Sequence, residues 1–354
     1  MGDGEEAERA HFLDVCWSFL EYQKDAAWEV GRWQRAIAAL DASDLQLWGV
    51  DLGQWMAHVQ TRVNENSRFL SLMPCAEICG APLPDRNIVY NVPPSHAVEP
   101  RNSSKVRSTL RQFVRDWAVE GEVERSNTYS PMVAALQKYL PAPALDEDGS
   151  FPEDKPKPRV LCPGSGLARL PFELAQRGYA AQGNEFSYHM ILGSNLILNT
   201  TDEDFIIFPY ILNFANRRMK ADCMRAVRVP DVCPSDALPE GSELSMAAGE
   251  FVEVYKDQKD EWDACATAFF LDTAKNVFLY IRTIANLIRP GGFWVNMGPL
   301  LYHYADVAAE ISIELSWEEV RVAICEYFDI VEEERKAAGY TSTPASLSRT
   351  IYHC

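Results

Sequence analysis

Apolar residues recur at helical spacing over the first part of the chain. Phe12, Cys16 and Phe19 lie on one face of a helix with 3.6 residues per turn, and similar patterns continue from about residue 5 to residue 72. Further helices are expected at 105–117 and 129–139, and a cluster of prolines predicts an irregular connection over 74–100. The pattern therefore predicts a helical region over residues 1–140.

After a linker at 141–158, rich in Pro, Asp and Lys, the pattern changes to short apolar runs that alternate with helical segments. The expected strands are 159–162, 179–184, 262–270 and 293–297, and the expected helices are 167–177, 187–199 and 274–288. This alternation is typical of βαβ units around a parallel sheet. We expect a doubly wound, Rossmann-like α/β domain over 159–354.

The composition narrows the range of partners. The 354 residues carry a formal net charge of -18, and a surface that negative repels phosphate backbones, so nucleic acid is not an expected partner. Arg217, Arg218 and Lys220 form a local basic patch, which is most simply a solvated face. The helical region, with Trp17 and Trp28, could cover an active site or form the surface of a homodimer.

The nine cysteines show no paired framework. Cys75 and Cys79 lack a second pair or a nearby His, so no metal site is predicted. The acidic start of the sequence does not resemble a leader peptide, and no apolar run approaches the roughly 20 residues that cross a bilayer. We expect a soluble cytoplasmic protein that could also enter the nucleus, with no membrane partner.

The strongest motif follows the first predicted strand, at Pro163-Gly164-Ser165-Gly166. Gly164 and Gly166 let backbone amides approach a ligand that a Cβ would block. Glu185 follows 19 residues after Gly166, at the end of the next predicted strand. In doubly wound folds a carboxylate at that position accepts hydrogen bonds from a ribose diol.

Arg169 helps to choose between nucleoside cofactors. A dinucleotide fingerprint places a third glycine at this position, where it allows close packing over a pyrophosphate. S-adenosylmethionine has a ribose but no phosphate, so it needs only the glycine turn and the acidic residue. The motif thus favours an S-adenosylmethionine-dependent methyltransferase over an NAD-linked oxidoreductase.

Three later features are expected at the same edge of the sheet. Glu250 and Phe251 follow a third strand, where an acidic and an aromatic residue can hold adenine. Asp272 lies just past the strand at 262–270, and His303 lies just past the strand at 293–297. Ligands of open α/β sheets bind at the carboxyl ends of strands, so we predict Asp272 and His303 to be catalytic.

Longer stretches identify a family. The chain resembles the carnosine N-methyltransferase (N2227-like) family of class I methyltransferases over nearly its whole length, less closely before Ser103. The matching stretches are STLRQFVRDW (108–117), CPGSGLARL (162–170), QGNEFS (182–187), WDACATAFFLDTAKN (262–276), PGGFWVNMGPLLYHY (290–304) and IELSWEEV (313–320).

The resemblance implies a reaction and a set of site residues. The family methylates the imidazole of β-alanyl-histidine, a small dipeptide, with S-adenosylmethionine as donor and S-adenosylhomocysteine as product. Cofactor contacts are implied for Gln112, Arg115, Gly164, Glu185, Glu250, Phe251 and Ala264, in addition to Gly166 from the turn. Substrate contacts are implied for Asp272, His303, Tyr340 and Tyr352.

The chain departs from the family pattern at several positions. Ala168 replaces a Gly, Glu250 replaces an Asp, and Ala264 replaces a cofactor-lining Cys, with Cys265 one position away. Thr350 stands where the family has a substrate-side Tyr, which bears on dipeptide preference. The family continues into an apolar last strand beyond the position of Cys354, so we expect either a truncated copy or a short sheet edge.

Two further hypotheses remain open at this stage. The methyl acceptor could be histidine in a protein or in another small peptide, particularly given Thr350. A helical scaffold with a degenerate, cofactor-free Rossmann domain is the alternative from another class, and the intact Gly164, Gly166 and Glu185 argue against it. For the enzyme, we hypothesise that Asp272 accepts the N–H of the non-reacting imidazole nitrogen and so fixes its tautomer.

Overall fold

The computed structural model describes residues 3–49, 51–75, 100–199, 204–341 and 352–353. The chain forms two compact units. The helical unit consists of Met1–Glu120, Leu192–Val232 and Thr341–Arg349, and the sheet unit consists of Gly121–Ile191, Cys233–Tyr340 and Thr350–Cys354.

A five-stranded sheet in the order β5-β2-β1-β6-β7 is the centre of the sheet unit, and every pairing in it is parallel. Its strands are β1 (Arg159–Pro163), β2 (Ala180–Glu185), β5 (Glu243–Ala248), β6 (Trp262–Ala268) and β7 (Ile288–Met297). The predicted strands are confirmed, and β5 ends two residues before Glu250, as expected for the third strand.

The strand order reverses beside β1. The chain runs outward from β1 through β2 to β5, and then returns to place β6 and β7 on the other side of β1. In open parallel sheets, ligands bind at the carboxyl ends of the strands on either side of such a reversal. The predicted Rossmann-like class is confirmed, and the switch point lies between the loops that follow β1 and β6.

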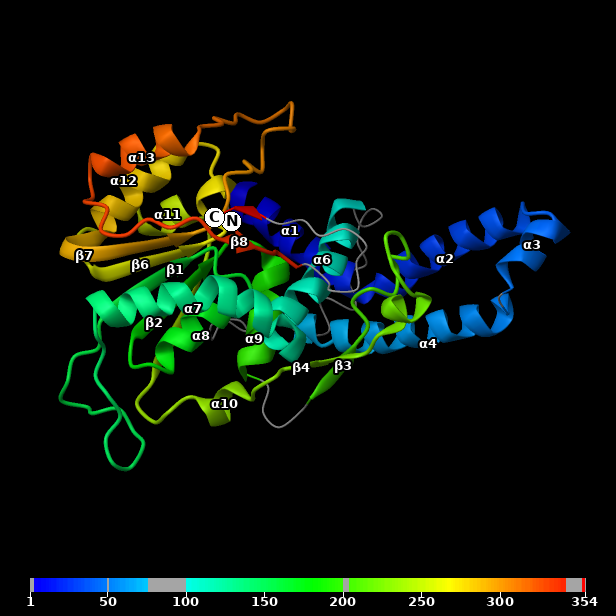
Figure 1. The fold of residues 1–354 in the computed structure, drawn as a ribbon, viewed down its shortest axis with the longest axis horizontal. Coiled ribbons are helices and arrows are strands. Elements are labelled where there is room, and N and C mark those ends of the chain that lie inside the picture. Colours follow the sequence, from blue (N-terminus) through cyan, green and yellow to red (C-terminus); the bar gives the residue numbers. More distant parts are fainter. Residues whose placement is uncertain (1–2, 50, 76–99, 200–203, 342–351, 354) are drawn as a thin grey trace. The chain divides into compact units, whose positions relative to one another are not determined.

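Helices cover both faces of this sheet (Figure 1). On one face lie α7 (Glu122–Tyr139) and α8 (Arg169–Ala175), and on the other lie α11 (Phe251–Tyr255) and α12 (Val277–Leu287). The sheet unit also contains α10 (Pro234–Ala237) and α13 (Trp317–Cys325), and α9 (Tyr188–Asn199) begins in it and ends in the helical unit. Side chains of a strand alternate between faces, so Val160 and Cys162 pack with α7 and α8, whereas Leu161 packs with α11 and α12. Strands that are buried on both faces are therefore almost continuously apolar.

The start of β7 differs from the prediction. The expected turn over Arg289–Gly292 lies inside the strand as an irregularity: Ile288 pairs with Trp262, and Phe293 pairs with Ala264. Four residues of β7, Arg289–Gly292, thus lie opposite the single residue Asp263 of β6, which is the geometry of an extended bulge. Proline and glycine are tolerated there because β7 is an edge strand among the described residues.

The helical unit is built from helices and one small antiparallel pair of strands. These are α1 (Asp3–Leu20), α2 (Tyr22–Ala38), α3 (Ala42–Trp48), α4 (Leu52–Leu70), α6 (Pro100–Trp117), β3 (Phe205–Ile207) and β4 (Val227–Val229). Asn66 on α4 donates to the hydroxyl of Tyr22 at 3.0 Å and to the carbonyl of Phe208 at 2.9 Å, and it accepts from the N–H of Phe208 at 2.7 Å. This fully buried amide fixes the segment after β3 against α4.

Short elements complete the chain. They are the 3-10 helices η1 (Met73–Cys75), η2 (Val119–Gly121), η3 (Lys220–Met224) and η4 (Leu271–Thr273), and the antiparallel pair β8 (Ala337–Ala338) and β9 (Tyr352–His353). The proline-rich connection expected over 74–100 falls almost entirely outside the described residues.

The compact units divide the chain at other places than the expected 1–140, 141–158 and 159–354. The α7 helix belongs to the sheet unit, because Tyr129, Met132, Val133 and Leu136 join the core that contains β1 and β6. Residues 192–232 belong to the helical unit, because β3 and β4 pair with each other and pack on α4 and α6. Periodicity along the sequence does not reveal that α7 belongs to the sheet unit or that residues 192–232 belong to the helical unit.

No helix among the described residues is long and apolar enough to span a membrane. Within those same ranges, no three His, Cys, Asp or Glu side chains are grouped in a way that could hold a metal ion.

Candidate functional site

The loop after β1 has the backbone conformation that its glycines allow. Gly164 has φ of +63° and Gly166 has φ of +56°, both in the left-handed region. A Cβ on Gly164 would stand 2.5 Å from Cδ2 of Phe270 in the loop after β6. Gly164 is therefore required twice, by its dihedral angle and by the close approach of the loops on either side of the switch point.

Glu185 ends β2 beside this loop. Its Oε2 accepts a hydrogen bond from the N–H of Gly166 at 2.9 Å, and its Oε1 accepts from the N–H groups of Phe186 at 2.9 Å and Ser187 at 2.8 Å. Both carboxylate oxygens therefore accept backbone hydrogen bonds, and the residue is partly exposed. The predicted pairing of the glycine turn with Glu185 is thus present as a direct contact.

Asn184 was missed by the sequence reasoning, although it precedes Glu185. Its side-chain Nδ2 donates to the backbone carbonyls of Ala247 at 3.2 Å and Gly249 at 3.0 Å. Its backbone carbonyl accepts from the N–H of Ser165 at 3.0 Å. The side chain is buried. One residue therefore connects the ends of β1, β2 and β5. An asparagine next to the acidic residue at a strand end was the available signal.

Gly183, one position earlier on β2, is required by packing. A Cβ there would lie 2.4 Å from Sδ of Met246 and 2.7 Å from Oγ of Ser165. Any side chain would displace Ser165 and with it the glycine turn. The role of Gly183 in QGNE is to let the loop after β1 lie close to β2.

Glu250 and Phe251 follow β5, as predicted. Oε2 of Glu250 accepts from the N–H of Glu253 at 2.8 Å, so Glu250 is the N-cap of α11 and remains partly exposed. The ring of Phe251 is only 3% exposed and makes an edge contact with Phe270, with ring centroids 5.3 Å apart. Little of this ring is available to a ligand, so a contact to adenine there would involve the ring edge or the backbone.

Tyr280 on α12 packs against Phe251 and Phe270, and the sequence analysis did not predict it as a site residue. It stacks on Phe270 with centroids 4.8 Å apart and rings 14° from parallel. Burial raises the pKa of Tyr280 to about 12, and the carboxylate of Glu250 adds to this effect. The phenol therefore stays protonated and can act as a hydrogen-bond donor near Glu250. A tyrosine within an amphipathic helix gives no such signal in the sequence.

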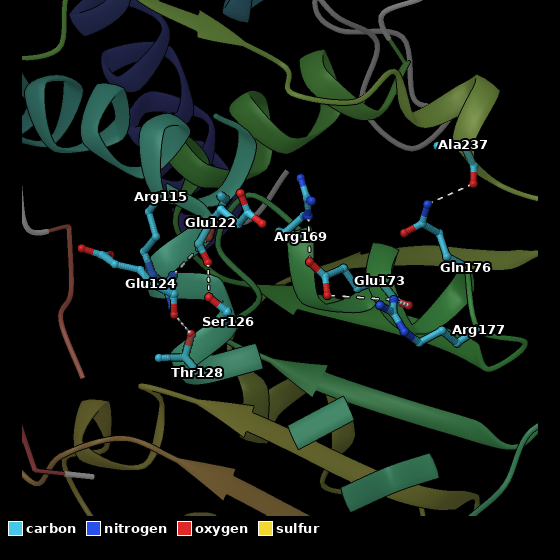
Figure 2. Close-up of polar contacts among 11 residues, drawn as sticks. Arg115, Glu122, Glu124, Ser126, Thr128, Arg169, Glu173, Gln176, Arg177 and Ala237 are labelled. Carbon is cyan, nitrogen blue, oxygen red and sulfur yellow. Dashed lines mark hydrogen bonds and ion pairs between the residues drawn. The ribbon is translucent and has the colours of Figure 1, made fainter. Parts of the chain in front are cut away.

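Arg169, which argued against a dinucleotide, begins α8. It donates to Oε1 of Glu173 at 3.0 Å, and the carbonyl of Glu173 accepts from Arg177 at 2.6 Å (Figure 2). Gln176 on the same helix donates to the carbonyl of Ala237 at 3.0 Å. Arg169 is nearly buried, so a large side chain occupies the position where a dinucleotide fold keeps a glycine.

Asp272 lies past the end of β6 in η4. Its side chain is 2% exposed, and its Oδ2 accepts from the N–H of Leu301, in the loop after β7, at 3.0 Å. Burial raises the pKa of the Asp272 carboxyl, while the Leu301 N–H and the charge of His303 act in the opposite direction. The loops after β6 and β7 thus place Asp272 and His303 near each other, as the sequence predicted.

His303 is held through its backbone. Its N–H donates to the carbonyl of Asp272 at 3.0 Å, and its side chain is exposed. The preceding residue, Tyr302, has φ of +51°, and its hydroxyl donates to the carbonyl of Leu315 at 2.6 Å. Left-handed backbone at a bulky residue costs about 1–3 kcal/mol and is concentrated at functional sites. The strain at Tyr302 directs the following residue, His303, out of the core.

The two predicted tyrosines near the chain end are described to different extents. Tyr340 packs against Phe269, with ring centroids 4.8 Å apart, at the carboxyl end of β6. Phe269 is a second bulky residue with positive φ, +52°, and its N–H donates to the carbonyl of Met297 at 2.7 Å. Tyr352 pairs with Ala338 through the β8–β9 backbone. The side chain of Tyr352 and the whole of Thr350 lie outside the described part of the chain.

Ala264 is the predicted cofactor residue that does not reach this edge. It is the third residue of β6, pairs with Val160 and Phe293, and has no exposed surface. Four residues separate it from the end of the strand, about 13 Å at 3.3 Å per residue. Its side chain packs in the core with β1 and α7, and its predicted cofactor contact stays a prediction.

The remaining predicted residues belong to the helical unit. Gln112 and Arg115 lie on α6 and are 8% and 6% exposed. Nη1 of Arg115 is 3.3 Å from Oδ1 of the neighbouring Asp116, which is also buried. Their predicted cofactor contacts stay predictions.

Comparison with known proteins identifies the family. A family model described as carnosine N-methyltransferase matches residues 94–354. The carnosine N-methyltransferase of Mus musculus is 36% identical over 364 residues, which cover 99% of this chain and 86% of the mouse protein. The Schizosaccharomyces pombe carnosine N-methyltransferase is 39% identical over 263 residues, which cover 70% of this chain and 68% of the yeast protein.

Solved structures are more distant. Phosphoethanolamine N-methyltransferase 2 of Haemonchus contortus has a TM-score of 0.38 and 11% identity, covering 68% of this chain and 44% of that one. The Bacillus subtilis protein YcgJ has a TM-score of 0.37 and 10% identity, covering 60% of this chain and 74% of that one. The assignment rests on the sequence matches, and the chain belongs to the carnosine N-methyltransferase family.

Proposed function

We propose that this enzyme transfers a methyl group from S-adenosylmethionine to the imidazole of β-alanyl-histidine (carnosine), a small dipeptide. The family supports the reaction. The single structural observation that supports it best is the convergence of Asp272 and His303 beside the switch point at which Gly164 and Glu185 also lie.

The residues at the ends of β1, β2 and β5 fit the cofactor. The cradle exists because Gly164 and Gly183 have no Cβ. In this proposal the carboxylate of Glu185, which ends β2 beside the turn, accepts hydrogen bonds from the ribose hydroxyls. In this proposal Gly164 and Gly166 lie at the methionine part, and Glu250 with the edge of Phe251 lies at the adenine. Gln112 and Arg115 would complete the site, as the family resemblance implies.

The main task for the protein is alignment. Bound S-adenosylmethionine supplies an electrophilic methyl group for in-line displacement, a reaction that depends on the orientation of the nucleophile. An imidazole has a pKa of about 6.5, so most of it is neutral at cellular pH and needs no strong base. Selecting the tautomer is the remaining requirement, because only a nitrogen with a free lone pair can attack.

Asp272 is suited to select the tautomer. The Leu301 N–H holds Oδ2, so the carboxylate presents a fixed orientation, and Oδ1 can accept the N–H of the non-reacting imidazole nitrogen. This leaves the lone pair of the other nitrogen free and stabilises the positive charge that develops on the ring. His303, Tyr340 and Tyr352 would bind the rest of the dipeptide.

A labelled-methyl assay tests the acceptor. Carnosine, free histidine and a mixture of histidine-containing peptides are offered separately to the full chain, with label incorporation as the readout. We expect carnosine to give the highest kcat/KM. Higher incorporation into the peptide mixture would overturn the dipeptide assignment and support histidine in peptides instead.

Isothermal titration with S-adenosylmethionine tests the enzyme class. We expect saturable binding at one site, which Glu185→Gln weakens by removing the ribose acceptor charge. Absence of any binding heat would contradict the proposal and favour a cofactor-free scaffold.

A further inference from the structure

Two arginines of the helical unit lie over one tyrosine, and two more on α6 interact electrostatically with this group. Arg107 and Arg111 are one turn apart on α6, and Arg217 and Arg225 flank η3. Tyr210 lies among them, 3% exposed. We refer to these five residues as the arginine cluster, and nothing in the methyl-transfer proposal uses them.

Two guanidinium groups lie over the ring of Tyr210. Cζ of Arg217 is 4.9 Å from the ring centroid, and Cζ of Arg225 is 5.4 Å from it. Cation–π contacts at partly exposed sites are weak attractions. The two cations are therefore held at one tyrosine by a modest attraction that does not neutralise either charge.

The charges in the cluster are largely uncompensated. Arg107 donates to Oδ2 of Asp25 at 2.8 Å, but within the described ranges no carboxylate lies within 4.0 Å of Arg111, Arg217 or Arg225. Burial lowers the pKa of Arg111; Tyr210 opposes this shift, and the charges of Arg107 and Arg217 add to it. Guanidinium groups do not deprotonate in proteins, so three positive charges remain together.

Arg225 also has buried hydrogen-bond donors that lack an acceptor. Its Nε and Nη2 are buried and have no hydrogen-bond acceptor among the described residues. A buried donor without an acceptor destabilises the fold, and such groups point to an ion or water as their partner. The side chains of Arg111, Arg217 and Arg225 are each partly exposed, so a small solute can reach the cluster.

The cluster contrasts with the chain as a whole, which carries 51 acidic and 33 basic residues. The sequence suggested a solvated basic face at Arg217, Arg218 and Lys220. Arg218 is exposed, as expected, but Arg217 lies over a buried ring and Lys220 lies over Trp55 at 4.3 Å. Concentrated positive charge in a strongly acidic protein is a selective attractor for anions.

We propose that the arginine cluster binds the phosphate group of a small molecule. A phosphate dianion offsets more of the charge of three guanidinium groups than a carboxylate does, and guanidinium forks match its oxygens in bidentate geometry. All five residues belong to the helical unit, and none of them is among the residues assigned to methyl transfer.

Isothermal titration of the full chain tests the proposal, with inorganic phosphate and glycerol 3-phosphate as separate probes in a chloride buffer. We expect saturable binding of at least one probe, weakened about 10-fold or more by Arg111→Met and by Arg217→Gln. The tighter probe distinguishes free phosphate from a phosphate monoester. Arg228→Gln is the matched control, because Arg228 is exposed in the same unit and paired with Asp204 at 2.6 Å.

Two results would overturn the site: no saturable binding of either probe, or binding by both cluster variants as tight as that of the unmodified chain. Arg217→Lys keeps the charge and removes the planar fork, so it tests the geometry if Arg111→Met does not fold. Retention of full phosphate affinity by Arg217→Lys would contradict bidentate recognition. Circular dichroism establishes that each variant is folded before titration.

Discussion

The carboxylate of Asp272 accepts a hydrogen bond from the backbone N–H of Leu301 at 3.0 Å, across 29 positions of sequence. This contact joins the loop after β6 to the loop after β7. Because a backbone group is the donor, the orientation of Asp272 does not depend on the side chain at position 301. It also brings His303, two residues later, to the same edge.

Asp272→Asn should lower kcat on carnosine by roughly 100-fold or more, because an amide cannot stabilise the developing charge as a carboxylate does. The Kd of S-adenosylmethionine should stay within about twofold, since the variant keeps the shape of the side chain. Steady-state kinetics and titration check both values. Asp306→Asn, at an exposed position of the loop after β7, is the control and should keep full activity. Unchanged kcat in Asp272→Asn would refute the tautomer role.

The same residue should make stability depend on pH. The pKa of Asp272 is raised on folding, so its favourable contribution is complete below the usual Asp pKa and is lost as pH rises through the raised value. The usual Asp pKa of about 3.9 sets the lower end of the pH window, at about pH 4. Between this pH and neutral pH, the free energy of unfolding of Asp272→Asn should fall less than that of the unmodified chain. Urea unfolding across this range measures the difference. Parallel pH profiles for the two proteins would contradict the prediction.

Gly164→Ala should weaken S-adenosylmethionine binding by about 10-fold or more and destabilise the fold, since the new Cβ meets Phe270 at 2.5 Å in a strained conformation. Gly149→Ala separates the two causes. Gly149 has φ of +85° with no atom within 4 Å of a Cβ, so this control adds strain of about 1–2 kcal/mol without a clash. Equal effects of the two variants on unfolding and on binding would show that the Phe270 contact is unimportant.

Asn184→Ala should raise the Kd of S-adenosylmethionine about 10-fold while leaving kcat at saturation nearly unchanged, because it releases the loop after β5 from the end of β2. Gln182→Ala is the matched control, because Gln182 lies on the same strand two residues before Asn184. Its side chain donates to Ser245 at 3.0 Å and accepts from Tyr255 at 2.7 Å. It should lower the melting temperature without changing Kd. A similar Kd for both variants would reduce Asn184 to a general stabilising role.

Much of the sheet unit follows from local pattern. Apolar runs such as Arg159–Pro163 predict buried strands, and glycines at Gly164 and Gly166 predict the turn, because each signal lies within a few residues of its effect. The position of Glu185 follows from the length of one helix and one strand. Asp272 and His303 were found because the carboxyl ends of parallel strands meet at one edge.

Other features depend on contacts between distant segments. Asn184 and Tyr280 acquire their roles from neighbours on β5 and around Phe270. The burial of Ala264 in the middle of β6 was not expected, because a matching family position does not show how deep in a strand it lies. The arginine cluster gathers positions 107 to 225 around Tyr210.

The sequence by itself determined the alternation of strands and helices, the glycine turn and its acidic partner, because helical period, strand period and turn chemistry are local properties. Only the tertiary structure decided that α7 joins the sheet, that residues 192–232 join the helices, and that Leu301 orients Asp272. The physical reason is that these depend on which buried faces and unpaired backbone groups meet after folding, and such pairings have no fixed spacing along a chain.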